Sequence, residues 1–210
     1  MNTAISGAIK SHNEIRIDLD IIQQWIAPEN HVLDLACGDG ALLKSLKEHK
    51  NVEGYGLEID QEKITAAIAN GVNVVEANLD TGLSQFADNS FDTVVMTQAL
   101  QAMRYPHLVL DEMLRIGKQC IVTFPNFGHW QARIFLLTHG RMPVTKELSY
   151  QWYDTPNIHF CTVKDFEALC AEKNILINQR EFVAERFLDR QIKGICPNLF
   201  SNTAIYLLSK

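Results

Sequence analysis

The chain has 210 residues, of which 47% are hydrophobic and 21% are charged, and this composition fits one globular domain with a sizeable core. A net charge of −6, with no cluster of lysines or arginines, argues against a nucleic acid or an anionic membrane as the main partner, because both require a basic surface. The five cysteines are scattered without a C-x-x-C pair, so we expect neither a zinc site nor a disulfide framework. Free cysteines also indicate a reducing compartment, and we expect the protein to be cytoplasmic.

The N-terminal region predicts a loosely ordered tail followed by a helix. Residues 1–13 are small and polar and hold no apolar run long enough for a signal peptide, and we expect no membrane-spanning segment in the chain. Apolar residues at helical spacing from Ile15 onward then predict a first helix that ends at Ala27, before Pro28.

The next stretch combines a strand, a glycine turn and a helix. Residues 32–35 form a short apolar run around one carboxylate, Asp34, which is typical of a buried parallel strand. Residues 37–40 predict a tight turn, and the apolar residues of 41–46 recur at helical spacing. Together they predict the first half of a nucleotide-binding βαβ unit, in which glycines leave the backbone and the helix N-terminus accessible to the ligand.

The charge of this turn indicates which kind of nucleotide it holds. A dinucleotide fingerprint, G-x-G-x-x-G, places a pyrophosphate on the helix N-terminus, but Leu43 stands where its third glycine is required. Asp34 and Asp39 would also repel a pyrophosphate. A ligand with cationic groups and no phosphate suits the turn better, and S-adenosyl-L-methionine, with its sulfonium and ammonium groups, is such a ligand. A nicotinamide oxidoreductase is therefore disfavoured.

Residues 34–40 resemble the D-x-G-C-G-x-G motif of the class I S-adenosylmethionine-dependent methyltransferases, with Ala36 where that family usually has glycine. The resemblance implies that the cofactor is S-adenosylmethionine and that Asp34, Ala36, Cys37 and Gly38 contact it. It also implies the fold: a Rossmann-like α/β three-layer sandwich with a mostly parallel seven-stranded sheet and an antiparallel last strand. Because the sequence shows no internal repeat, low-complexity tract or linker, we expect residues 1–210 to form a single domain. The alternative is an ordinary strand-to-helix turn.

Acidic residues follow the second predicted strand, over residues 52–60. Glu58 lies about twenty positions past Gly38, the offset at which an acid reaches the ribose hydroxyls, and we expect it to line the ligand site together with Ile59. The alternative is a solvated loop acid. Asp60 is predicted to cap a helix that runs to residue 70 and is ended by Gly71.

Two further strands are expected to bring polar residues to the same edge of the sheet. After the strand at 72–77, Asn78 stands where the methyltransferase family commonly has an acid that receives the adenine amino group; Asp80 is the alternative, and Leu79 lies between them. After the strand at 90–97, Thr97 and Gln98 are expected near the methionine part of the ligand. Because no N-P-P-Y or D-P-P-Y tetrapeptide follows, a methyltransferase acting on nucleobase amino groups is disfavoured.

The second half of the chain predicts alternating helices and strands with an aromatic, irregular stretch between them. Pro106 opens a helix through Arg115, and a fifth strand follows at 119–124. A helical stretch at 133–137 is broken at 140–143, and residues 150–159 are aromatic and irregular. Thr162 begins the last long helix through a capping box, and residues 175–183 and 203–208 are the final strands.

Three blocks, residues 125–130, 140–145 and 152–159, resemble those of the MetW family of methionine biosynthesis proteins, and the similarity extends over about residues 30–183. This resemblance implies an accessory or regulatory role beside homoserine O-acyltransferase and implies no methyl acceptor. The alternative is an active methyltransferase on an unidentified small molecule. The aromatic side chains of these blocks fit an interface, a ligand pocket or a cover for one end of the core.

No catalytic triad is predicted. The general-base candidates are Tyr153, Asp154, His129 and His159, and the spacing of the histidines matches no metal template. Methyl transfer from a sulfonium consists largely of positioning an already activated donor, so a missing base does not exclude catalysis.

Overall fold

The computed structural model describes residues 17–145, 150–184 and 186–210. The predicted N-terminal tail and the start of the first predicted helix at Ile15 therefore lie outside the described residues. Within them, seven strands form one sheet in the order β3-β2-β1-β4-β5-β7-β6. The strands are β1 (His31–Leu35), β2 (Glu53–Glu58), β3 (Asn73–Glu76), β4 (Phe91–Thr97), β5 (Gly117–Pro125), β6 (Leu176–Val183) and β7 (Thr203–Ser209).

The direction of the strands confirms the expected sheet. Strands β1 to β5 pair in parallel, with Asp34 opposite Gly56 on β2 and opposite Val95 on β4. The last strand, β7, pairs antiparallel with both β5 and β6. The fold is thus a Rossmann-like α/β sandwich, as predicted.

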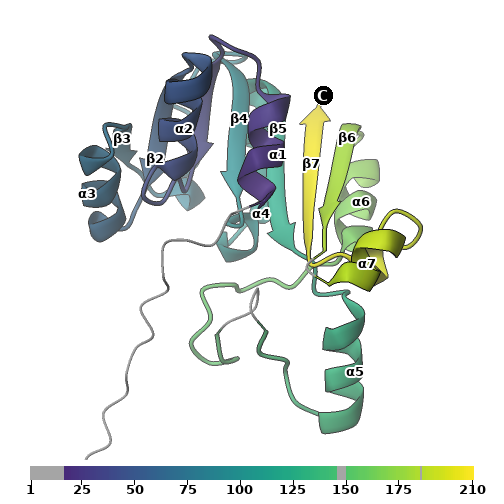
Figure 1. The fold of residues 1–210 in the computed structure, drawn as a ribbon. Helices are drawn as coiled ribbons and strands as arrows, with labels where there is room; N and C mark the ends of the chain where they lie inside the picture. Colours follow the sequence, from purple (N-terminus) through teal and green to yellow (C-terminus); the bar gives the residue numbers. More distant parts are fainter. Residues whose placement is uncertain (1–16, 146–149, 185) are drawn as a thin grey trace, which may run out of the picture.

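Helices cover both faces of the sheet (Figure 1). On one face α1 (Ile17–Trp25), α2 (Ala41–Lys50) and α3 (Gln61–Ala69) pack on side chains such as Val32, Val95 and Ile121. On the other face α4 (Pro106–Ile116) and α6 (Val163–Glu172) enclose the larger core cluster. Burial of these apolar side chains is the main source of stability, at about 25 cal/mol per Å².

Local signals in the sequence set several helix ends as predicted. The side chain of Asp60 accepts hydrogen bonds from the N–H groups of Glu62 and Lys63 and caps α3, and Gly71 follows it at φ 75°. Thr162 and Asp165 form the capping box of α6. Two short 3₁₀ turns, η1 (Leu79–Thr81) and η2 (Leu100–Ala102), follow β3 and β4.

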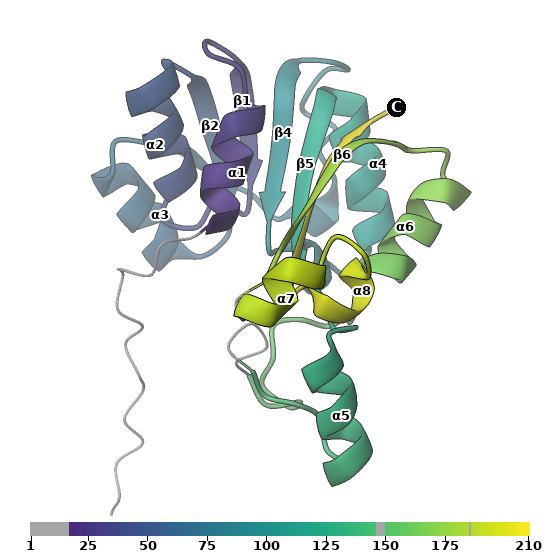
Figure 2. The same cartoon turned by 45° about the vertical axis from the view of Figure 1, so that its right-hand side comes forward.

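Three helices near the C-terminal half differ from the sequence-based expectation. Helix α5 (Trp130–His139) begins three residues earlier than predicted and projects from the lower edge of the sheet (Figures 1 and 2). Two short helices that were not predicted, α7 (Phe187–Ile192) and α8 (Pro197–Phe200), lie between β6 and β7. Within the described ranges, none of the helices is long and apolar enough to cross a membrane.

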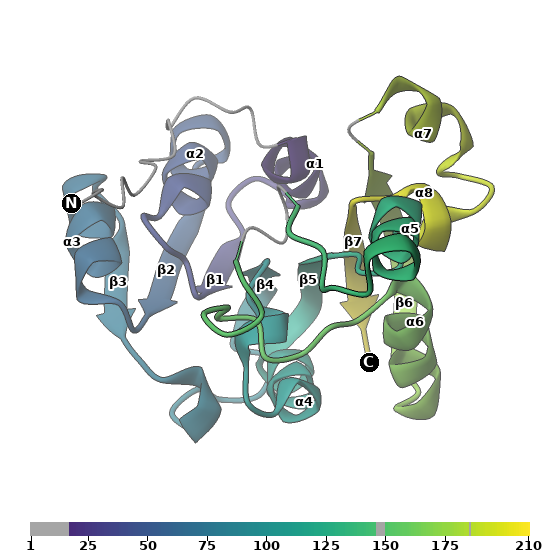
Figure 3. The ribbon, with the colours of Figure 1, turned by 90° about the horizontal axis from the view of Figure 1, so that it is seen from below.

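The carboxyl ends of the five parallel strands lie along one edge of the sheet, the lower one in Figure 1. Open α/β sheets bind their ligands at this edge. Seen from below, the described chain that leads into α6 from residue 150 passes across the ends of β4 and β5 (Figure 3). Hydrogen bonds hold it there, because the N–H groups of Ile158 and His159 both donate to the carbonyl of Gln101 in η2. This edge is therefore the candidate site.

Candidate functional site

The turn after β1 and the end of β2 are joined through one carboxylate. Glu58 is 5% exposed, and its Oε2 accepts a hydrogen bond from the N–H of Gly38 at 2.9 Å. Its Oε1 accepts from the N–H groups of Ile59 at 2.9 Å and Asp60 at 3.1 Å. Since a carboxylate offers about four lone-pair positions, three bonds leave about one for a ligand hydroxyl. Glu58 is thus not a solvated loop acid.

The two glycines of the turn have different roles. Both adopt positive φ, 61° at Gly38 and 74° at Gly40. A Cβ on Gly40 would lie 2.8 Å from the Val72 side chain, whereas a Cβ on Gly38 would meet nothing within 4 Å. Gly40 therefore packs the turn against the start of β3, and Gly38 borders open space in front of the strand ends. The backbone at Gly38 is thus open beside the buried carboxylate of Glu58, and an adenosyl ligand would fit this arrangement.

Three carboxylates give the turn a negative field. Burial, as the largest cause, and the charges of Asp34, Glu58 and Asp39 raise the pKa of the Cys37 thiol to about 12, against the lowering effect of a backbone hydrogen bond. The Cys37 thiol therefore stays neutral and is not a nucleophile. The field favours cationic ligands, as the sequence argument expected.

Burial also predicts how the cysteines react. The five thiols are free, and four of them, those of Cys37, Cys120, Cys161 and Cys170, have pKa values raised chiefly by burial, whereas Cys196 is exposed. A soluble thiol reagent at about pH 7.5 is expected to label Cys196 rapidly in the native protein and all five after unfolding. Peptide mapping of the labelled protein checks this; rapid native labelling of Cys37 would contradict the buried turn.

Ala36 occupies the position at which the resembled motif has glycine. Its φ is 56°, so an alanine adopts the left-handed conformation that costs about 1–2 kcal/mol. We expect Ala36→Gly to raise the free energy of unfolding by about 0.5–1 kcal/mol, because the relieved strain exceeds the added unfolded-state entropy. Ala66→Gly, within helix α3, is the control and should lower the free energy of unfolding by about 1 kcal/mol. Denaturant titration measures both; equal losses would show that Ala36 is not strained.

The residues predicted around the adenine divide into exposed and buried ones. Ile59 is exposed beside Glu58, where an apolar side chain can pack against a base. Asn78 is exposed, but its side-chain oxygen already accepts from the N–H of Asp80 at 3.0 Å. Asp80 in turn accepts from the N–H of Arg104 at 2.8 Å. Leu79 is buried in the core cluster, so only its backbone can reach a ligand.

Near the end of β4 the structure adds Asp18 of α1 to the candidate site, a residue that the sequence analysis did not predict. Gln98 has φ 52°, its N–H donates to Thr123, and its Nε2 donates to Oδ2 of Asp18 at 3.2 Å. Asp18 is buried on α1 and lies on the same helical face as Ile22 and Ile26. An acidic residue on the otherwise apolar face of α1 is the sequence signal that could have predicted this role of Asp18. Thr97 is half-buried beside Gln98, while Asp34 is 1% exposed within β1.

The candidate general bases are not brought together. His129 is buried, with Nδ1 receiving the N–H of Gln131 and Nε2 at 3.4 Å from Asp189, so both ring nitrogens are engaged. Tyr153 and Asp154 are exposed, and His159 contacts the carbonyl of Arg104 at 3.4 Å. No group of three or more potential metal ligands occurs among the described residues.

The aromatic side chains form separate pairs instead of one group. Phe127 packs on Phe160 with ring centroids 4.8 Å apart, and Trp152 meets Tyr153 edge-on at 5.7 Å. Trp152 and Tyr153 are mostly exposed, so they do not cover the end of the core.

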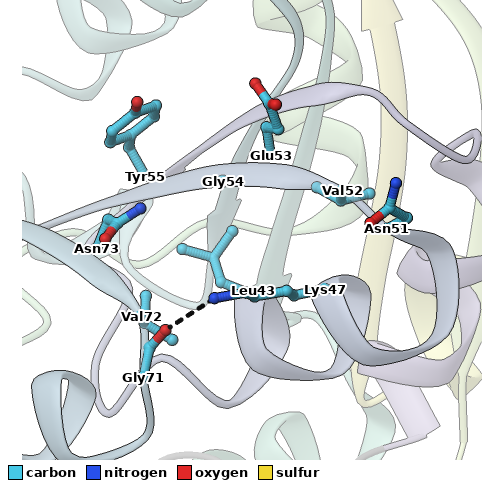
Figure 4. Close-up of a pocket in the computed structure, with 10 residues that line it drawn as sticks. All are labelled: Leu43, Lys47, Asn51, Val52, Glu53, Gly54, Tyr55, Gly71, Val72 and Asn73. Carbon is cyan, nitrogen blue, oxygen red and sulfur yellow. Dashed lines mark hydrogen bonds between the residues drawn. The ribbon is translucent and has the colours of Figure 1, made fainter.

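A separate cavity of about 380 Å³ lies between α2 and the first residues of β2 and β3 (Figure 4). It is at the amino ends of these strands, and Lys47 and Gly71 meet across it through a hydrogen bond of 3.4 Å. Its position is opposite to the edge at which parallel sheets bind ligands, so we do not assign the nucleotide to it.

Comparison with known proteins gives a match over most of the chain. The family model for methionine biosynthesis protein MetW matches residues 16–208. A bifunctional methionine biosynthesis protein MetXA/MetW of Rhodopirellula baltica is 33% identical over 213 residues. That match covers 97% of this chain and 34% of the relative, so the chain spans about a third of that protein's length.

Solved structures agree on the fold. An S-adenosylmethionine-dependent methyltransferase from Mesorhizobium loti has a TM-score of 0.65 at 17% identity, and the match covers 91% of this chain and 100% of that one. The [4+2]-cyclase SpnF has a TM-score of 0.64 at 18% identity, with coverages of 91% and 80%. At such identities the likeness shows the fold alone, and two named activities on one fold leave the reaction open.

Proposed function

The chain belongs to the MetW family of methionine biosynthesis proteins, and from this membership and the geometry of the glycine turn we propose that it binds S-adenosylmethionine and acts as the accessory partner of a homoserine O-acyltransferase. The observation that carries the ligand proposal is the open space at Gly38 beside the buried carboxylate of Glu58. Backbone N–H and carbonyl groups of residues 36–38 would border the ligand, and the turn supplies no positive side chain that a phosphate would require.

Each part of the ligand has residues of fitting chemistry. Glu58 would accept a hydrogen bond from a ribose hydroxyl, Ile59 would pack on the adenine, and Asn78 would accept from its amino group. Thr97 and Gln98 would border the methionine part, where the carboxylates of Asp18 and Asp34 favour the ammonium and sulfonium groups. When bound, the ligand would supply an activated methyl group or act as a signal.

The partner proposal has a different support. The relative from Rhodopirellula baltica is a bifunctional protein whose name joins MetXA and MetW, so one polypeptide holds both parts there. We propose that the MetXA-type protein of the same cell, expected to be a homoserine O-acyltransferase, is the partner of this chain.

The test is a coexpression experiment. The tagged chain is expected to copurify with the acyltransferase of the same organism and to change its rate with homoserine and acyl-CoA on mixing. Two proteins that never associate, with an unchanged rate, would refute the accessory role. The second candidate, an active methyltransferase, is favoured by the methyltransferase fold, and it requires formation of S-adenosylhomocysteine with cell metabolites as acceptors.

A further inference from the structure

Helix α5 exposes apolar side chains all round its axis. Of its ten residues only Ala132 is buried, while Ile134, Phe135, Leu136 and Leu137 are exposed, the last at 84%. Consecutive residues of a helix point about 100° apart, so these four side chains surround the helix. A helix that is apolar on all sides is normally buried, and its own domain covers only the first turn of α5.

The projecting helix is held firmly at its base. The indole N–H of Trp130 donates to Asp189 of α7, and the guanidinium of Arg186 lies 5.4 Å from the Trp130 ring centroid. Arg133 donates through Nε to the carbonyl of Gly128 at 2.6 Å. Gly140, at φ 61°, ends the helix. The exposed apolar residues are therefore presented in a fixed direction, beyond the lower edge of the sheet (Figures 1 and 2).

The charge around α5 identifies the kind of partner. Residues 113–145 contain no aspartate or glutamate, although the whole chain carries a net charge of −6. Arg133 and Arg141 flank the apolar residues. A symmetric pair of this chain would bring two patches together that both carry Arg133 and Arg141 and no carboxylate from residues 113–145, because an isologous interface pairs one patch with its copy. A different protein with an apolar groove and an acidic rim avoids this pairing of like charges.

We propose that α5 is the docking helix for the acyltransferase partner and inserts Ile134, Phe135, Leu136 and Leu137 into an apolar groove of that protein. This inference rests on the proposed function, in which the two proteins form a complex. It specifies where the interface lies. In the relative from Rhodopirellula baltica the MetW part is one portion of a longer polypeptide, which keeps such a partner adjacent.

A charge substitution on α5 tests the inference against a matched control. Leu137→Glu replaces an 84% exposed side chain, and Ile195→Glu replaces an 85% exposed one in the segment between α7 and α8. We expect Leu137→Glu to weaken binding of the acyltransferase at least about 30-fold, as loss of an interface hot spot does. Ile195→Glu should leave it unchanged. Both variants should keep the circular dichroism spectrum of the wild type.

The remaining outcomes separate the alternatives. If the wild type binds the acyltransferase and Leu137→Glu binds equally well, the assignment of α5 is wrong while the proposed function stands. If the wild type does not bind, the proposed function itself fails. Wild-type dimers that Leu137→Glu abolishes, or binding to vesicles of phosphatidylcholine and phosphatidylglycerol that it abolishes, would instead assign α5 to self-association or to a membrane surface and overturn the inference.

Discussion

A Glu58→Ala variant is expected to bind S-adenosylmethionine about 10- to 100-fold more weakly than the wild type, because it loses one hydrogen bond from a ribose hydroxyl to a charged group, which contributes about 1.5–3 kcal/mol. The variant should also unfold more readily, by about 2 kcal/mol, since the N–H groups of Gly38, Ile59 and Asp60 lose their acceptor. Calorimetric titration and denaturant unfolding measure the two effects separately.

The control for Glu58 lies on the same strand. Glu53 begins β2 at its opposite end, and its carboxylate is largely exposed beside His31. Glu53→Ala should leave ligand affinity unchanged. Glu58→Gln keeps the size of the side chain but places an amide N–H₂ against one of the three donors, so it should reproduce most of both losses. Full affinity in Glu58→Ala would show that the acid holds the turn together and contacts no ligand.

Gly38→Ala is expected to lower ligand affinity about tenfold or more without a packing clash in the free protein. The added methyl group points into open space, which the ligand would fill, and overfilling a packed site costs about 1–3 kcal/mol. The left-handed backbone adds a loss of about 1–2 kcal/mol in folding stability.

Gly71→Ala is the matched control for this strain. Gly71 also has positive φ, and a Cβ added there would meet nothing within 4 Å, but the residue lies at the end of α3, away from the strand ends. It should lose similar folding stability and bind the ligand normally. Gly40→Ala should destabilise more than either, because its Cβ would collide with Val72. Equal ligand affinities in the variants of Gly38 and Gly71 would show that the space beside Gly38 is not the ligand site.

The sequence predicted the frame of the site because its signals are local. The glycine turn after β1, the capping by Asp60 and the acid at Glu58 follow from short motifs and their spacing, and the seven-stranded sheet with an antiparallel last strand follows from the family resemblance that such motifs carry. The three N–H donors around Glu58 could not be predicted, since they depend on how the turn after β1 approaches β2.

The other features that the sequence did not predict depend on contacts between distant parts of the chain. Trp130 and Asp189 are 59 residues apart in sequence, and only the fold reveals that α7 holds the base of α5. The pairing of Gln98 with Asp18 spans 80 residues. The aromatic blocks were recognised as distinctive, but their division into separate pairs and the exposure of α5 required the arrangement in space.

Titration of S-adenosylmethionine and of NAD into the wild-type protein tests the central claim most directly. The negatively charged turn and the open space at Gly38 predict saturable binding of S-adenosylmethionine at one site per chain and no binding of NAD. Binding of NAD without binding of S-adenosylmethionine would contradict the account, because it would require the turn to accept a pyrophosphate beside its carboxylates.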